Sequence, residues 1–298
     1  MATDILVAKR IYLTGCTGEI GSRLTLLLLE KGYEVFGVRG KRTCYILNSR
    51  HTCINLDLLD SSSILGIKEF QPDLLVHTAW LTTPNEFWES SQNNEWLLAS
   101  QRIISEFLLS GGSHVVVTGS CGEYSWETSE SLSEDSLEQP STSYGKTKLE
   151  LLNWMRGQDI KFLWTRTFFQ FGLNERQGRI VPSIIDSLAL GNEFIVQNPS
   201  DVRDFVFIDD VVRALEILIS NEALGIVNIG SGMEQKVGAM SMKIAKLLGR
   251  EDLLKFNNHK VHDTKVVSNP EKLESLIGTF AWTPIELALI KTIKARNH

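Results

Sequence analysis

The sequence lacks a long hydrophobic run, an excess of basic residues and a dense set of cysteines. No stretch approaches the ~20 uninterrupted apolar residues of a membrane-spanning helix, and the first residues lack the charged and then apolar segments of a secretory signal. The 36 acidic residues outnumber the 30 basic ones, for a net charge of −6, which argues against binding to the phosphate backbone of nucleic acids. We therefore expect neither a membrane nor a nucleic acid as partner, and a cytoplasmic location.

The four cysteines, Cys16, Cys44, Cys53 and Cys121, form no CxxC pair and have no histidine at a spacing typical of metal sites. This pattern predicts neither a zinc site nor a disulfide framework, so we expect no bound metal. Cysteines that stay reduced are typical of cytoplasmic proteins.

The remaining composition is that of a globular protein. Its 298 residues are 43% hydrophobic and 22% charged, and this length permits one large domain or two modest ones. Apolar β-rich runs alternate with helical patterns through the first two-thirds, which predicts an α/β fold with a doubly wound parallel sheet. The expected strands span residues 10–14, 33–38, 53–56, 73–77, 114–118 and 161–167, and the expected helices span 20–31, 61–70, 90–110 and 144–156.

The regular alternation ends after Gly172. Short apolar runs interrupted by glycine and proline follow, so residues 171–298 are expected to form mainly a second, smaller region. Two runs in it, RDFVFIDD at 203–210 and GIVNIGS at 225–231, have the character of strands that could return to the first sheet. We therefore expect the two regions to be interleaved.

A glycine-rich turn, TGCTGEIG at 14–21, lies between the first expected strand and the first expected helix. Its spacing is GxxGxxG rather than GxGxxG, so the glycines alone are weak evidence. Their position carries the argument, because the first βα turn is where a dinucleotide pyrophosphate binds. Residues 1–170 are thus predicted to be a dinucleotide-binding domain with a Rossmann fold, with return segments near 203–230.

The second expected strand ends in a basic run, GVRGKR at 37–42, where an NAD-binding protein would place an acidic residue. Arg39 at this point favours NADP over NAD, because arginine suits a 2′-phosphate. The alternative is that this basic run is a solvent-exposed turn that binds no phosphate. Asp57, after the third strand, either bonds the adenine amino group or is an ordinary turn aspartate.

Tyr144 and Lys148 stand four residues apart at the start of an expected helix, so they share one face. The neighbouring ammonium is expected to lower the pKa of the Tyr144 hydroxyl and make it a usable proton donor or acceptor near neutrality. Ser120 follows the fifth strand, at the edge of the sheet where ligands bind. Each residue alone is common in structural roles, but the three in this order after a glycine-rich turn indicate an active site.

Four motifs resemble those of the extended short-chain dehydrogenase/reductases, in particular the nucleotide-sugar epimerase/dehydratase/reductase group. They are TGCTGEIGS at 14–22, VVVTGSCGEY at 115–124, YGKTK at 144–148 and RDFVFIDDVV at 203–212. The resemblance covers nearly the whole chain. It implies that Ser120 and Tyr144 contact the sugar, that Lys148 holds the nicotinamide ribose, and that Arg203 contacts the substrate's phosphate or nucleoside. It also implies a nucleoside-diphosphate sugar as substrate, and a homodimer.

The expected contacts of cofactor and substrate follow from these motifs. Those of the cofactor are Gly15, Thr17, Gly18, Glu19, Ile20, Gly21, Arg39, Asp57, Leu58, Thr78, Ala79 and Lys148. Those of the substrate are Trp80, Cys121, Phe169, Gln170 and Arg203.

This chain departs from the family's pattern at two places. The Asp-Glu pair that follows the catalytic residue in dehydratases is Cys121-Gly122 here, which argues against water elimination, although Glu123 is one position away. The asparagine usual in the family's substrate motif is Phe169, and Gln170 is expected to take over its polar role.

The expected function is NADPH-dependent reduction of a nucleotide-linked 4-keto-6-deoxy sugar. The alternative is a 4-epimerase that oxidises and re-reduces one carbon on a retained NAD with the same residues. A non-catalytic regulator that senses a dinucleotide is disfavoured, because it would have no need for Ser120, Tyr144 and Lys148 together.

Overall fold

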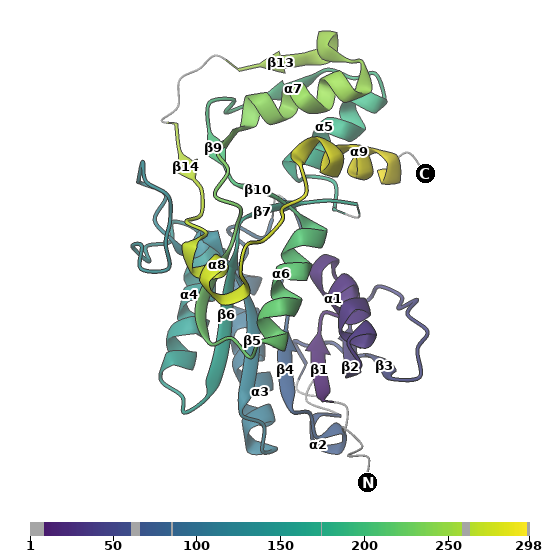
Figure 1. Ribbon diagram of the computed structural model, residues 1–298, viewed down its shortest axis with the longest axis vertical. Helices are drawn as coiled ribbons and strands as arrows, with labels where there is room; N and C mark the ends of the chain where they lie inside the picture. Colours follow the sequence, from purple (N-terminus) through teal and green to yellow (C-terminus); the bar gives the residue numbers. More distant parts are fainter. Residues whose placement is uncertain (1–8, 61–65, 85, 174, 258–262, 297–298) are drawn as a thin grey trace.

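A parallel sheet forms the centre of the larger lobe (Figure 1). The computed structural model describes residues 9–60, 66–84, 86–173, 175–257 and 263–296. Within these ranges the sheet has seven strands, and every neighbouring pair is parallel. In spatial order they are β11 (Gly225–Ile229), β6 (Lys161–Thr167), β5 (His114–Ser120), β4 (Leu74–His77), β1 (Arg10–Thr14), β2 (Glu34–Arg39) and β3 (His51–Asn55).

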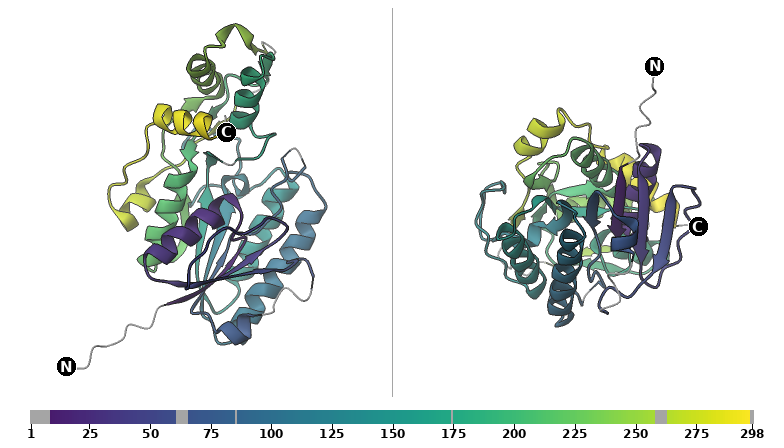
Figure 2. Two further views of the ribbon diagram at one scale, coloured as in Figure 1. Left: turned by 90° about the vertical axis from the view of Figure 1, so that its right-hand side faces the viewer. Right: turned by 90° about the horizontal axis from the view of Figure 1, so that it is seen from below.

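Helices cover both faces of this sheet, which confirms the predicted doubly wound α/β fold (Figure 2). One face carries α1 (Glu19–Glu30), α6 (Ile208–Ser220) and α8 (Glu271–Ile277). The other carries α2 (Ile67–Phe70), α3 (Gln92–Leu109) and α4 (Ser143–Arg156). The first five residues of the expected helix at 61–70 lie outside the described residues.

The inner strands β1, β4 and β5 are largely apolar because both of their faces are buried. Successive side chains of a strand point to opposite faces, and β1 shows this directly. Ile11 and Leu13 pack in the core beneath α1 and α6, whereas Tyr12 packs in the core beneath α3 and α4. All three are fully buried.

The smaller lobe has a core of its own, drawn from residues after Phe169. Its helices are α5 (Ile180–Ala189), α7 (Val237–Leu248) and α9 (Ile285–Arg296). Its short strands are β7 (Phe169–Phe171), β8 (Phe194–Val196), β9 (Val202–Arg203), β10 (Phe205–Phe207), β12 (Gln235–Lys236), β13 (Leu254–Phe256) and β14 (Lys265–Val266). Single 3₁₀ turns occur at η2 (Cys121–Glu123) and η3 (Glu251–Leu253).

One of the two expected return strands joins the main sheet and the other does not. Residues 225–229 form β11 beside β6, as predicted. Residues 203–210 instead divide among β9, β10 and the start of α6, and β10 pairs with β7 outside the main sheet. The acidic pair Asp209–Asp210 explains the early change from strand to helix, because acids are favoured in the first turn of a helix. No helix within the described ranges is long and apolar enough to cross a membrane.

Candidate active site

A cavity of about 650 Å³ lies at the carboxyl ends of β1, β2, β3 and β4. This is the edge of a doubly wound sheet at which ligands bind. Most of the residues expected to contact the cofactor, and two of those expected to contact the substrate, line it. They are Gly15, Thr17, Gly18, Glu19, Ile20, Gly21, Asp57, Leu58, Thr78, Ala79, Trp80 and Gln170.

The glycine-rich turn is shaped for a ligand that approaches the backbone closely. Gly15 has a φ of +75°, a conformation that other residues rarely adopt. A Cβ on Gly21 would lie 2.1 Å from the Gly15 carbonyl oxygen, so this position too requires glycine. Gly18 is the N-cap of α1 and brings no side chain over the helix N-terminus, which leaves room for an anion there. The turn therefore fits the pyrophosphate of a dinucleotide.

Of the two residues predicted to contact the adenosine part of the cofactor, Asp57 lines the cavity and Arg39 does not. Asp57 lines the cavity but also accepts a hydrogen bond from the Leu59 amide at 3.0 Å, so it stabilises its own turn. Arg39 does not line the cavity: its guanidinium donates to the backbone oxygens of Gly40 at 3.1 Å and Arg42 at 3.2 Å. The basic side chains that line the cavity here are Lys41 and Arg42.

Ser120, Tyr144 and Lys148 lie behind the Trp80 wall of the cavity. Thr142 caps α4 by accepting a hydrogen bond from the Gly145 amide, which sets Tyr144 in the first turn and Lys148 one turn later. The Tyr144 ring packs edge-on against Trp80, with ring centroids 6.4 Å apart. Lys148 donates to the Thr118 carbonyl oxygen at 2.8 Å, and Ser120 follows Thr118 on β5. The three predicted residues thus come together behind Trp80, and none of them lines the cavity itself.

The expected lowering of the tyrosine pKa does not occur. Burial raises the pKa of Tyr144, and the opposing effects of Arg179 and of a hydrogen bond with Ser120 are smaller. Burial also lowers the pKa of Lys148 to about 7, although the charge of Glu123 acts in the other direction. For Tyr144 the effect of burial outweighs that of the nearby charges, so the ground state of its side chain is the neutral phenol.

Glu123 lies beneath Ser120 rather than facing a ligand. Its carboxylate accepts hydrogen bonds from the Ser120 amide at 2.7 Å, from the Trp164 indole at 2.9 Å and from the Arg166 guanidinium at 2.7 Å. The Glu123 and Arg166 side chains are both fully buried. Glu123 therefore holds the end of β5 in place, and it does not supply the acid that a dehydratase would need next to Ser120.

The remaining expected substrate contacts form a second group beside Ser120. The Arg203 guanidinium lies 5.2 Å from the Phe169 ring centroid and 5.5 Å from that of Trp126. It is held there by Asp201 at 2.7 Å and by the Thr264 carbonyl and hydroxyl. Cys121 is buried, and burial raises the pKa of its thiol to about 12, so it is a neutral packing residue rather than a nucleophile.

Gln170 and three residues that sequence reasoning missed line the end of the cavity next to the smaller lobe. The Gln170 side-chain oxygen is buried without a hydrogen-bond partner among the described residues, so it is available to a ligand. Glu175, Arg176 and Arg179 lie here, between β7 and α5. Burial and the nearby Glu19 raise the pKa of Glu175 to about 8. The sequence offers only one indication of these residues, the charged run ERQGR at 175–179, and this run matches no known motif.

Comparisons with known proteins agree with this arrangement. The model of the NAD dependent epimerase/dehydratase family matches residues 11–230. The chain is 26% identical to the GDP-6-deoxy-D-talose 4-dehydrogenase of Aggregatibacter actinomycetemcomitans over 310 residues, which cover 96% of this chain and 98% of that one. It is 26% identical to the UDP-glucose 4-epimerase of Mycolicibacterium smegmatis over 276 residues, covering 86% and 88%. The structure of MoeE5 in complex with UDP-glucuronic acid and NAD is similar with a TM-score of 0.82 at 25% identity, covering 97% and 99%.

Proposed function

The chain belongs to the NAD-dependent epimerase/dehydratase family, as its motifs predicted, and we propose that it reduces a nucleotide-linked 4-keto-6-deoxy sugar with NADPH. The observation that carries the proposal is the placement of Tyr144 and Lys148 against Trp80, which lines the cavity. A neutral phenol is the state that a proton donor needs, and donation to a carbonyl oxygen is what a ketone reduction requires. The similarity to a 4-dehydrogenase of a 6-deoxy sugar supports the position of the carbonyl, because a dehydrogenase and a reductase catalyse one reaction in opposite directions.

The chain's own groups carry out the proton chemistry and the orientation of the substrate. When bound, the dinucleotide supplies the hydride for the sugar carbon. Tyr144 donates its hydroxyl proton to the carbonyl oxygen as negative charge develops there. The Ser120 hydroxyl donates a hydrogen bond to the same oxygen, and its position is fixed by the Glu123 carboxylate through the Ser120 amide. Lys148 supplies positive charge next to Tyr144 whenever it is protonated.

The choice of NADPH rests on charge at the adenosine end of the cavity. Lys41 and Arg42 line it there, and the residues at the end of β2 include no carboxylate for a ribose hydroxyl. Basic side chains at this point suit a 2′-phosphate. A diffusible NADPH also suits a reaction with net consumption of hydride.

The test measures both the cofactor and the stoichiometry. Protein denatured after purification is analysed for released dinucleotide, and NADPH consumption is followed with a synthetic nucleoside-diphosphate 4-keto-6-deoxy sugar. We expect one NADPH oxidised per sugar reduced, at a much higher rate than with NADH. Tightly held NAD with no net consumption would overturn the reductase assignment.

The second candidate is a 4-epimerase. It is favoured by the similarity to a UDP-glucose 4-epimerase and by the fact that the same Ser120, Tyr144 and Lys148 can serve oxidation and reduction at one carbon. The same experiment separates the two, because an epimerase interconverts two nucleotide sugars without added cofactor. Titration with a panel of nucleoside diphosphates then identifies the base that the substrate carries.

A further inference from the structure

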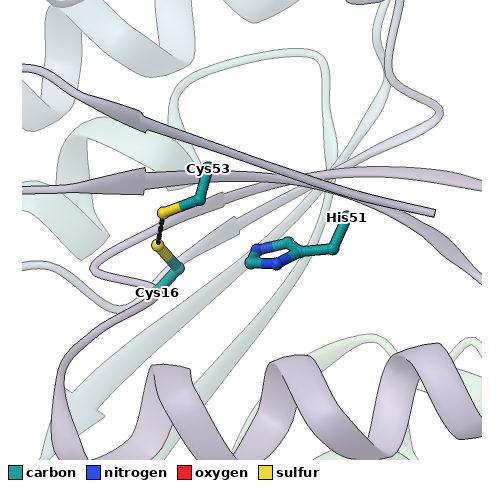
Figure 3. Close-up of side chains that lie close together, drawn as sticks. All are labelled: Cys16, His51 and Cys53. Atoms are coloured by element: carbon teal, nitrogen blue, oxygen red, sulfur yellow. Dashed lines mark hydrogen bonds between the residues drawn. The ribbon is translucent and has the colours of Figure 1, made fainter. Parts of the chain in front are cut away.

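The spacing of the cysteines and histidines in the sequence predicted no metal site, yet three of these side chains lie close together in the structure. Cys16 in the glycine-rich turn meets His51 and Cys53 of β3 (Figure 3). The two sulfur atoms are 3.5 Å apart, and one ligand atom from each of the three residues lies within 4.8 Å of the others. His51 and Cys53 are two apart on one strand, so their side chains share a face.

His51 is oriented as a metal ligand would be. Its Nδ1 lies 3.2 Å from the Ile46 carbonyl oxygen. Because a carbonyl oxygen can only accept, Nδ1 carries the proton and Nε2 keeps its lone pair. Nε2 is buried and has no hydrogen-bond partner among the described residues. A histidine whose other ring nitrogen donates to a backbone carbonyl is the usual arrangement at protein metal sites.

Gly37 lies directly against the ligand atoms of Cys16 and His51. Gly37 of β2 pairs with Cys53 in the sheet. A Cβ on Gly37 would lie 2.8 Å from the Cys16 sulfur and 2.9 Å from His51 Nε2, so any larger residue would push these ligand atoms away. The sequence thus places its smallest residue where the thiol and the imidazole converge.

A third thiol lies near this group. Cys44, in the segment between β2 and β3, is close enough to Cys53 to raise the pKa of its thiol, but its sulfur is not within 4.8 Å of all three ligand atoms. Cys44 and Cys16 also line a second cavity of about 670 Å³, which gives an ion a path to the cluster. Two of these residues packed together would be explained as ordinary buried cysteines. Ordinary packing does not explain two thiols in contact with each other and an unpartnered, buried imidazole nitrogen beside them.

We propose that Cys16, Cys53 and His51 bind one Zn²⁺ ion at a structural site, and that Cys44 moves in from the segment between β2 and β3 as the fourth ligand. In tetrahedral zinc sites the bond lengths of about 2.3 Å to sulfur and 2.0 Å to nitrogen place ligand atoms about 3.5–3.8 Å apart. The separations among Cys16, His51 and Cys53, 3.5 Å between the two sulfurs and at most 4.8 Å between any two ligand atoms, need only a small contraction to reach that geometry. Thiolates and imidazole are also the ligands that zinc prefers.

A bound ion would link three segments of the chain: the glycine-rich turn, the segment from 40 to 50, and β3. Cys16 stands between Gly15 and Thr17, which line the dinucleotide cavity, and Cys44 follows Arg42, which lines it from the other side. The segment from 40 to 50 forms no helix or strand, and the ion would tie it to β3 and to the glycine-rich turn. This role does not depend on the reaction that the enzyme catalyses.

Binding of the ion must release protons. A cysteine thiol has an ordinary pKa of about 8.5 and is a metal ligand only in its deprotonated form. The thiols are therefore protonated at neutral pH without the metal, and each that becomes a ligand passes its proton to solvent. Proton release into a weak buffer is a direct readout of ligation by thiols.

The test titrates metal into the full-length protein after removal of bound metal with a chelator under reducing conditions. With Co²⁺ alone we expect one ion per chain, the charge-transfer absorption of cobalt thiolates, the visible bands of tetrahedral cobalt and release of protons. Zn²⁺ alone should then displace the cobalt. The Cys44→Ser and His51→Asn variants, which leave the core packing largely intact, should each lower Co²⁺ affinity about tenfold or more.

Matched controls are the Cys121→Ser and His114→Gln variants, which remove a thiol and an imidazole elsewhere in the chain and should bind Co²⁺ as the wild type does. The proposal is overturned if the folded wild type gives no thiolate–cobalt absorption, or if Cys44→Ser and His51→Asn bind as the wild type does. It is also overturned if the untreated protein is lighter by two hydrogens and Cys16 and Cys53 are found in one disulfide-linked peptide pair.

Discussion

The Lys148 ammonium nitrogen lies 3.9 Å from the centre of the Trp80 ring. Trp80 lines the dinucleotide cavity, whereas Lys148 is only 2% exposed and donates to the Thr118 carbonyl oxygen behind it. The indole therefore shields the ammonium from solvent while its ring face partly stabilises the charge. Burial prevails, since the pKa of Lys148 falls to about 7. The charge of this lysine is thus sensitive to pH near neutrality.

The first prediction concerns stability and pH. The unfolded chain holds the Lys148 proton up to its ordinary pKa of 10.5, whereas the folded chain loses it near pH 7. Between these values the unfolded state binds more protons, so the free energy of unfolding contributed by this group rises with pH. Urea denaturation between pH 7 and 10 should show a steeper rise for the wild type than for Lys148→Met. Parallel pH profiles of the two proteins would contradict the buried, readily neutralised lysine.

The second prediction concerns Tyr144. Replacement by phenylalanine keeps the ring packing against Trp80 and Phe87 but removes the hydroxyl. We expect kcat to fall by about 10²- to 10⁴-fold, the usual contribution of a general acid, with little change in dinucleotide affinity. Steady-state kinetics and fluorescence titration with NADPH measure the two quantities. Unchanged turnover would mean that Tyr144 is not the proton donor.

The sequence predicts the features of this site that depend on local order. Strand ends, the glycine-rich turn and the four-residue spacing of Tyr144 and Lys148 follow from periodicity and motif, and the structure places them accordingly. The pKa values could not be predicted, because the spacing of two residues on a helix does not reveal how deeply the helix face is buried. The direction of the Tyr144 shift was therefore wrong.

Contacts that depend on which strands pair in the sheet could not be predicted from the sequence either. Cys16 meets Cys53 because β1 and β3 both flank β2, and Glu123 meets Arg166 because β5 and β6 pair in one particular register. Neither pair is close in the chain, so no motif contains both members. Glu138, which precedes α4, likewise bonds the buried Arg166 although the two residues are far apart in the chain.

The third prediction concerns the buried ion pair beneath Ser120. Glu123→Gln preserves an acceptor for the Ser120 amide and the Trp164 indole but leaves the Arg166 charge partly uncompensated. Removing one partner of a buried pair costs about 3–5 kcal/mol, so the free energy of unfolding should drop by roughly this amount. Urea denaturation at neutral pH measures it. The control is Glu286→Gln, which breaks an exposed contact with Lys243 and should change stability little.

The fourth prediction separates two arginines near the adenosine end of the cavity. Arg42 lines the cavity, whereas the Arg39 guanidinium bonds backbone oxygens of its own loop. If NADPH binds with its 2′-phosphate here, Arg42→Ala removes a charged hydrogen bond worth about 1.5–3 kcal/mol, or about 10- to 100-fold in Kd. NADH lacks that phosphate and should bind Arg42→Ala as it binds the wild type.

Arg39→Ala is the matched variant for this comparison, since it removes the same charge from the same loop. Because Arg39 acts on the loop through the Gly40 and Arg42 carbonyl oxygens, its loss should weaken NADPH less than the loss of Arg42 does. Isothermal titration of both variants with both dinucleotides gives the four ratios needed. Equal losses of NADPH and NADH affinity in Arg42→Ala would show that the charge acts on the shared part of the cofactor, and the preference for NADPH would then lose its structural basis.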